Sequence, residues 1–362
     1  MAEPVRLGVI GTGVFGLMHL RCYKQLERAG RAVLVAAAYS GRGRNRAEMR
    51  AREFGLRLYD DYHAMLQRED LDGVSIVTPD FLHREMAEAA LQAGRHILVE
   101  KPLATTVDGC EAIQRAAAQR GLLVQVNFHQ RYDPSHIELA TLVRSGRLGQ
   151  ALYGYAHLEE RIEAPTTWFP RWAGHSSPAW FLGVHLYDLA RWALDSEPVR
   201  VAATGAKIVL VARGIDTYDS VQARVEFANG ATVTFDTSWV LPHGFEALDN
   251  QGIRLVGSAG LIEVDAQDRG VRSCVDGDGM RTYNPSFFQE TTAPGGGAVY
   301  RGYGLDSIAH FVDNVAYLKD GGSLGGLAGS YPDAADGLAA TRVAAAAHES
   351  LDHRGALISL SP

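Results

Sequence analysis

The sequence has little cysteine. Its 362 residues include three, Cys22, Cys110 and Cys274. Three is an odd number for a framework of paired disulfides, and none of them stands at the spacing of a zinc or iron ligand set, so we expect no metal site. Free cysteines in small number are typical of a reducing compartment, and we therefore expect a cytoplasmic protein.

Long apolar runs and an excess of positive charge are also lacking. No apolar run approaches 18 residues, and the N-terminal MAEPVRLGVIG runs directly into a strand rather than into a signal-peptide pattern. The formal net charge is −7, which disfavours nucleic acid and anionic membrane surfaces as partners. We expect two or three domains that act on a small molecule.

Strands and helices alternate over residues 1–127. This alternation predicts a parallel sheet with helices on both faces, that is, an α/β Rossmann domain. The expected strands are 5–11, 32–39, 73–79, 96–102 and 122–128.

The pattern changes after residue 128. Strands then follow one another with turn signals between them, at Asn229-Gly230 and at 258–260. We expect residues 128–330 to form an α+β domain with a large open-faced, mostly antiparallel sheet, and residues 331–362 to form a C-terminal helix and tail that pack back on the Rossmann domain. The expected strands are 151–160, 199–209, 219–229, 231–239, 253–264 and 271–278.

A glycine-rich motif stands between the first strand and the first helix. It reads Gly11-Thr12-Gly13-Val14-Phe15-Gly16. The first glycine permits a tight turn, the second lets a pyrophosphate approach the backbone, and the third permits close packing of helix and strand. In this position the motif predicts a dinucleotide site.

The residues after the second strand bear on the choice of cofactor. An NAD site usually has Asp or Glu there, for the ribose 2′-hydroxyl. This chain has Tyr-Ser-Gly-Arg-Gly-Arg at 39–44, without an acid. Ser40 and Arg42 can bind a 2′-phosphate, so we expect NADP, with NAD as the alternative.

The ends of the later parallel strands supply the other expected cofactor contacts, because the carboxyl ends of such strands line the cofactor crevice. Lys101 can also hydrogen-bond a reacting hydroxyl or carbonyl oxygen. From spacing alone, a surface ion pair between Glu100 and Lys101 is equally consistent. The expected contacts are Thr78, Pro79, His83, Glu100, Lys101 and Asn127.

The segment TPDFLHREMAEAALQAGRHILVEKPLA (78–104) resembles the signature of the Gfo/Idh/MocA oxidoreductases. The resemblance continues through QRYDP (130–134), RSGRLGQ (144–150) and GSAGLIEVD (257–265), and so covers nearly the whole chain. It implies a Rossmann domain, an open-faced sheet domain, bound NAD(P), and redox chemistry at a carbon that bears a hydroxyl. It also implies that Lys101 is the catalytic or substrate-polarising lysine.

The family's second motif, D-x-G-x-H-x-x-D, corresponds to residues 181–188. Gly183, His185 and Asp188 match, but Phe181 replaces the first aspartate. The resemblance implies that His185 transfers the proton, whereas the stretch taken alone favours a core histidine held by a carboxylate. Asp188 is suited to orienting the imidazole or to a structural role.

Arg131 and Trp172 complete the expected substrate contacts with Lys101 and His185. We expect an NAD(P)-dependent oxidoreductase that interconverts a secondary alcohol and a ketone on a cyclic polyol, such as a sugar or a cyclitol, and forms a homodimer or homotetramer. Three alternatives stay open: a dehydrogenase of aromatic-acid dihydrodiols, a redox-assisted NAD-dependent glycosidase, and a non-catalytic dinucleotide-binding sensor.

Overall fold

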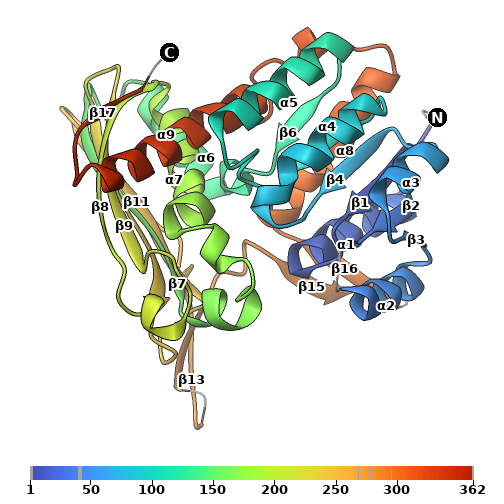
Figure 1. Ribbon diagram of the computed structural model, residues 1–362, viewed down its shortest axis with the longest axis horizontal. Coiled ribbons are helices and arrows are strands. Elements are labelled where there is room, and N and C mark those ends of the chain that lie inside the picture. Colours follow the sequence, from blue (N-terminus) through green and yellow to red (C-terminus); the bar gives the residue numbers. More distant parts are fainter. Residues whose placement is uncertain (1–2, 40–42, 268, 278, 295, 361–362) are drawn as a thin grey trace. The chain divides into compact units, whose positions relative to one another are not determined.

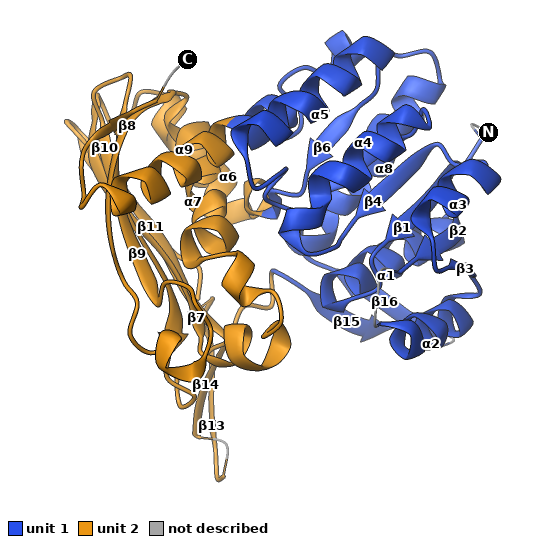
Figure 2. Cartoon of the chain, viewed as in Figure 1, with its two compact units in different colours: residues 1–129, 287–338 blue, residues 130–286, 339–362 orange. Residues whose placement is uncertain are grey.

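The structure, a computed structural model, describes residues 3–39, 43–267, 269–277, 279–294 and 296–360. The chain forms two compact units, residues 1–129 with 287–338 and residues 130–286 with 339–362 (Figure 2). This division differs from the expected one. Residues 287–330, expected in the second domain, belong to the first unit, and most of the C-terminal segment belongs to the second.

The first unit contains a six-stranded parallel sheet of order β3-β2-β1-β4-β5-β6 (Figure 1). This is the strand order of the dinucleotide-binding Rossmann fold. β4, β5 and β6 are short apolar runs that are almost wholly buried, as expected for strands covered on both faces. The strands are β1 (Val5–Ile10), β2 (Ala32–Ala38), β3 (Arg57–Tyr59), β4 (Gly73–Ile76), β5 (His96–Val99) and β6 (Val124–Val126).

Helices connect these strands. Because such crossovers are right-handed, the helices before and after the reversal of strand order at β1 and β4 lie on opposite faces of the sheet. Thr106 caps the helix α5 by accepting a hydrogen bond from the Gly109 amide at 3.1 Å. The helices are α1 (Val14–Arg28), α2 (Arg44–Phe54), α3 (Tyr62–Arg68), α4 (His83–Gln92) and α5 (Val107–Arg120).

A late segment of the chain completes the first unit. The hairpin β15 (Gln289–Thr292) and β16 (Ala298–Arg301) leads into α8 (Tyr303–Lys319), which packs against α1. Ile308 and Phe311 of α8 lie in the same buried cluster as Leu20 and Tyr23 of α1. This apolar face of α8 is the reason that residues 287–338 belong with the Rossmann sheet.

The second unit contains a seven-stranded sheet of order β12-β11-β7-β10-β9-β8-β17. It is mostly antiparallel, and β7 and β10 form a parallel pair. The strands are β7 (Ala151–Arg161), β8 (Pro198–Ala206), β9 (Ser220–Phe227), β10 (Thr232–Leu241), β11 (Asp249–Gly257), β12 (Gly260–Asp265) and β17 (Ile358–Ser359), and a separate hairpin is formed by β13 (Val271–Val275) and β14 (Gly279–Tyr283).

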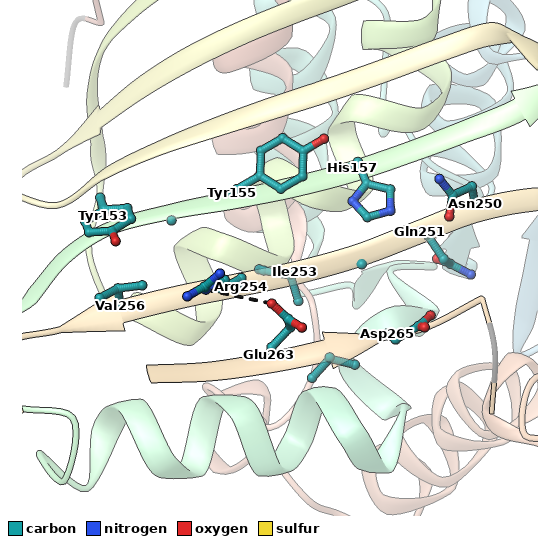
Figure 3. A pocket seen from close by; sticks show the side chains of 13 residues that line it. Tyr153, Tyr155, His157, Asn250, Gln251, Ile253, Arg254, Val256, Glu263 and Asp265 are labelled. Carbon is teal, nitrogen blue, oxygen red and sulfur yellow. Dashed lines mark ion pairs between the residues drawn. The ribbon is translucent and has the colours of Figure 1, made fainter. Parts of the chain in front are cut away.

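One face of this sheet is covered and the other is open. Along β7, Gly154, Ala156 and Leu158 are buried, whereas Tyr153 and Tyr155 are exposed. The helices α6 (Pro134–Arg144) and α7 (Val184–Leu194) pack on the covered face. The open face has a hollow of about 520 Å³ over β7, β11 and β12 (Figure 3).

Two local expectations differ from the structure. The single strand expected at 253–264 is the hairpin of β11 and β12, which turns at the predicted signal at 258–260. The last helix, α9 (Ala334–Asp352), was expected on the Rossmann domain, but residues 339–352 belong to the second unit, where His348 stacks on Trp180 with ring centroids 5.5 Å apart.

Candidate active site

The glycine motif forms the turn between β1 and α1. Gly11 has a φ of +108°, and a Cβ added to it would lie 2.2 Å from the Val77 carbonyl oxygen. A Cβ on Gly16 would lie 2.2 Å from the Gly11 carbonyl oxygen. The fold itself therefore requires these two glycines. A Cβ on Gly13, in contrast, would have no atom within 4 Å, so the space beside Gly13 is open to a ligand.

The N-terminus of α1 faces this open space. Gly13 is the N-cap and provides no side-chain cap, and the first turn has no acidic residue. Val14 and Phe15 are 74% and 39% exposed. An uncapped helix N-terminus with free amides and a positive dipole end suits a phosphate group. The residues present here fit a dinucleotide.

His83 joins two loops at the carboxyl edge of the sheet. Its Nε2 lies 2.9 Å from the Thr78 carbonyl oxygen after β4, and its Nδ1 lies 2.7 Å from the Pro102 carbonyl oxygen after β5. The ring is 1% exposed. His83, expected to contact the cofactor, thus holds the loops on which Thr78, Pro79 and Lys101 lie.

Glu100 and Lys101 do not form a surface ion pair, because each is only 7% exposed. Glu100 accepts hydrogen bonds from Asn127 Nδ2 at 2.6 Å and from His19 Nε2 at 3.1 Å. The structure therefore brings the expected residues Glu100, Lys101 and Asn127 together at the ends of β5 and β6. His19 was not predicted, although it lies on the buried face of the helix that follows the glycine motif.

The predicted 2′-phosphate contacts, Ser40 and Arg42, lie outside the described residues. Close to them, Arg44 begins α2 and its Nε donates to Glu48 at 2.8 Å. Arg44 is thus engaged within its own helix.

In the second unit, the motif of His185 begins in a π-helical turn, Ala179–Gly183, and continues into α7. His185 and Asp188 are 5% and 1% exposed. Asp188 accepts two hydrogen bonds from Arg131, at 2.8 Å from Nε and 2.5 Å from Nη2. The guanidinium of Arg131, expected to contact the substrate, is thus held in a buried ion pair.

Phe181 and Trp172 belong to an aromatic cluster. Trp172 stacks on Phe169 with ring centroids 4.4 Å apart, and Phe181 lies 5.5 Å from Trp172 and 5.8 Å from Trp239. The position of the family aspartate is therefore occupied by a ring that packs against other rings and makes this part of the unit apolar.

Two carboxylates of the seven-stranded sheet were not singled out from the sequence. Asp249 of β11 pairs directly with Glu160 of β7. Strand alternation places Glu160 on the same face as Leu158, which is the face covered by helices. Burial raises the pKa of Asp249 to about 6. The only signal in the sequence was the run of acids in HLEERIE (157–163), which does not identify a partner 89 residues away.

The residues that the structure describes contain neither a membrane-spanning helix nor a cluster of metal ligands. No helix in this part of the chain is long and apolar enough to cross a membrane. Among the same residues, no group of three or more His, Cys, Asp or Glu side chains is arranged to hold a metal ion.

Comparisons with known families match both units. Residues 5–128 match the family described as "Oxidoreductase family, NAD-binding Rossmann fold". Residues 136–263 match the "GFO/IDH/MocA C-terminal domain".

Comparisons with curated proteins give relatives that act on inositols. Inositol 2-dehydrogenase 2 of Saccharopolyspora erythraea is 32% identical over 261 residues, which cover 72% of this chain and 73% of that protein. The scyllo-inositol 2-dehydrogenase (NAD(+)) of Bacillus subtilis is 28% identical, over 71% of this chain and 75% of that protein.

Solved structures share the fold over the full length. The scyllo-inositol dehydrogenase of Lactobacillus casei, solved with NAD(H) and scyllo-inositol, superposes with a TM-score of 0.76 at 19% identity, over 99% of this chain and all of that chain. GenD2 from gentamicin A biosynthesis, solved with NAD, has a TM-score of 0.80 at 20% identity, over 100% of this chain and 98% of that chain. The glycine turn, the strand order and these matches together place the chain in the GFO/IDH/MocA family of NAD-binding oxidoreductases.

Proposed function

We propose that the protein is a dehydrogenase that interconverts a secondary alcohol and a ketone on a cyclic polyol, with an inositol as the first candidate. The observation that carries this proposal is the retention of a buried Lys101 after β5 and a buried His185 on α7 in a chain that is 32% identical to an inositol 2-dehydrogenase.

Lys101 and His185 have separate tasks in this proposal. The Lys101 amine donates a hydrogen bond to the reacting oxygen and stabilises the negative charge that develops there. His185 takes the hydroxyl proton during oxidation and returns it during reduction. The turn at residues 11–16 would hold the dinucleotide, which would supply the acceptor for the hydride of the carbinol carbon. Loss of this hydride and of the hydroxyl proton converts the alcohol to a ketone.

The second unit provides groups for the rest of the polyol. Asp249 and Glu160 have carboxylate oxygens that accept hydrogen bonds from hydroxyls. The rings of Phe169, Trp172 and Phe181 exclude water from the covered face of the sheet. We assign the two carboxylates to substrate binding in the absence of the motif aspartate.

For the cofactor, we propose a preference for NADP. The support is the sequence after β2, where Ser40 and Arg42 are available and no acid occurs between residues 39 and 44. The Bacillus subtilis relative has NAD(+) in its name, and the two solved structures contain NAD(H) or NAD, so NADH is the cofactor with which NADPH has to be compared. Dissociation constants of NADPH and NADH, measured by nicotinamide fluorescence, test the preference, and tighter binding of NADH contradicts it.

The catalytic assignment is tested with Lys101→Met and His185→Gln. We expect kcat/KM with myo-inositol or scyllo-inositol to fall by at least about 100-fold in each variant, while the dissociation constant of the reduced dinucleotide changes little. His175→Gln serves as the control, because His175 is exposed and precedes the motif. Full activity in either catalytic variant contradicts the assignment, and binding of dinucleotide without turnover of any polyol contradicts the reaction.

The dihydrodiol alternative needs Arg131, Arg161 or Arg171 to bind the carboxylate of an aromatic acid. Arg131 is paired with Asp188 and Arg161 Nη2 lies 3.3 Å from Glu163 Oε1, which disfavours these two, whereas Arg171 is exposed. Product analysis distinguishes the glycosidase alternative, since a glycosidase gives no net change in nicotinamide absorbance.

We also propose that a second copy of the chain covers the open face of the seven-stranded sheet, in a homodimer or homotetramer. Large apolar side chains are exposed there: Tyr153 at 58%, Tyr155 at 43% and Leu261 at 51%. Exposed apolar area of this kind is typical of an interface.

A further inference from the structure

A continuous chain of hydrogen bonds lies inside the first unit and includes Glu100, the residue directly before Lys101. His19 and Tyr23 are one turn apart on α1, Ser75 is in β4, and Glu100 and Asn127 directly follow β5 and β6. All five are almost completely buried, with exposed fractions between 0% and 7%.

The bonds connect all five side chains. Tyr23 Oη lies 2.5 Å from Ser75 Oγ, and Ser75 Oγ lies 3.0 Å from His19 Nδ1. His19 Nε2–H then donates to Glu100 Oε1 at 3.1 Å, and Asn127 Nδ2 donates to the same oxygen at 2.6 Å. Burial raises the pKa of Tyr23, so its hydroxyl remains a donor.

Glu100 carries a charged carboxylate although its side chain is buried. Burial by itself would raise its pKa, but the hydrogen bonds from His19 and Asn127 and the charge of Lys101 lower the pKa to about 2. The carboxylate is thus ionised at every physiological pH. In a buried environment a negative charge acts on its neighbours with little screening.

The side chains described around a narrow recess at Glu100 are mainly apolar or aromatic. This recess is lined by Phe15 and Met18 of α1, His129, Phe287, and Gly304 and Ile308 of α8. His129 packs against rings, with centroids 5.2 Å from Phe287 and 5.9 Å from Tyr303. The acidic residue of this part of α8, Asp306, acts on Cys22. His19 and Lys101 are the groups that interact electrostatically with Glu100.

We propose that His19 and Asn127 are positioning residues that keep Glu100 ionised and fixed, and that this buried carboxylate keeps the neighbouring Lys101 amine protonated. Lys101 then remains a hydrogen-bond donor to the reacting oxygen over the working pH range, and His185 alone exchanges the substrate proton. This inference rests on the proposed role of Lys101, but its electrostatic part can be measured without any reaction.

The measurement is the pH dependence of lysine acetylation in the intact chain. The sequence has only four lysines, Lys24, Lys101, Lys207 and Lys319, so each is followed by mass spectrometry of its own peptide after trace labelling with isotopic acetic anhydride. Glu100→Gln preserves the shape and one acceptor oxygen for His19 and Asn127 but removes the charge. We expect the labelling pKa of Lys101 to fall by about one unit or more in this variant, which is about tenfold faster labelling at a pH below both values. His19→Gln and Asn127→Ala should give smaller shifts in the same direction.

Two controls separate electrostatics from altered packing. Glu100→Asp changes the packing but keeps the charge, and it should restore the labelling pKa of Lys101 toward the wild-type value. Glu27→Gln is the matched substitution beside another lysine, because Glu27 forms an ion pair with Lys24. That pair is partly exposed, so this variant should shift Lys24 little and Lys101 not at all.

The results distinguish this inference from the proposed function. An unchanged labelling pKa of Lys101 in Glu100→Gln, or an equal shift in Glu100→Asp, overturns the electrostatic role. A fall of the Lys101 pKa that moves the alkaline limb of the kcat profile by the same amount supports both proposals. A fall that leaves the kcat profile unchanged supports the role of Glu100 and contradicts the catalytic role of Lys101.

Discussion

Replacement of Arg131 by methionine breaks the bidentate ion pair between α7 and the segment that precedes α6. The Arg131 and Asp188 side chains are 9% and 1% exposed. Removal of one partner leaves the Asp188 carboxylate buried without its counter-charge, and such losses cost about 3–5 kcal/mol. For a unit of this size that corresponds to roughly 6–20 °C in the unfolding temperature of the second unit.

The same helix offers a matched control. Arg191 forms a bidentate ion pair of the same kind, from Nε to Glu197 Oε2 at 2.8 Å and from Nη2 to Glu197 Oε1 at 2.5 Å, but the Glu197 side chain is 62% exposed. Arg191→Met should therefore cost no more than about 1 kcal/mol. Differential scanning calorimetry of the two variants compares a buried with an exposed pair of equal geometry.

The double variant Arg131→Met with Asp188→Leu removes both charges and should recover most of the lost stability. The reasoning is refuted if Arg131→Met unfolds at the wild-type temperature. A raised KM for polyol at unchanged stability would instead show that Arg131 serves the substrate, as the sequence suggested.

Three further predictions concern other parts of the chain. Gly16→Ala should be strongly destabilised, because its Cβ would lie 2.2 Å from a backbone oxygen, and thermal unfolding measures this loss. Gly13→Ala should keep the wild-type stability but lose affinity for the dinucleotide, which NADH fluorescence measures; an unchanged affinity would contradict phosphate binding beside Gly13. Burial raises the pKa of Asp249 from 3.8 to about 6, so the protonated side chain contributes stability below pH 4, and this stability is lost as the pH rises through 6. In urea unfolding, Asp249→Asn should therefore be about 2–3 kcal/mol more stable than wild type at pH 8 and equal to it at pH 3. Parallel pH profiles of the two proteins would contradict this. Tyr155→Glu should reduce the mass measured by light scattering if a second copy covers the open sheet face, and an unchanged mass would argue against that interface.

The sequence predicted the Rossmann sheet well because its signals are local. Each buried strand is a short apolar run, and each helix has the apolar spacing of one covered face. The glycine motif and Glu100-Lys101 stand at the strand ends where the alternation expects them. The change to a mostly antiparallel sheet after residue 128 was equally visible, because the turn signals separate successive strands.

The parts that were missed depend on contacts between distant residues. Nothing near α8 indicates that Phe311 packs with α1, nearly 300 residues earlier. Glu160 and Asp249 meet only through the register of two strands, and the bond between His19 and Glu100 requires α1 to lie over β5. Single-sequence patterns describe faces and ends of elements, but they do not specify which elements are neighbours.

The return of residues 287–338 to the first unit has a practical consequence for anyone who wishes to produce the nucleotide-binding part by itself. A fragment cut at residue 127 would expose the side of α1 on which Ile308 and Phe311 normally pack. Such a fragment should aggregate rather than fold. A workable fragment would join residue 129 to residue 287 through a short engineered linker and continue to the first turn of α9, so that two distant stretches of sequence are expressed as one polypeptide.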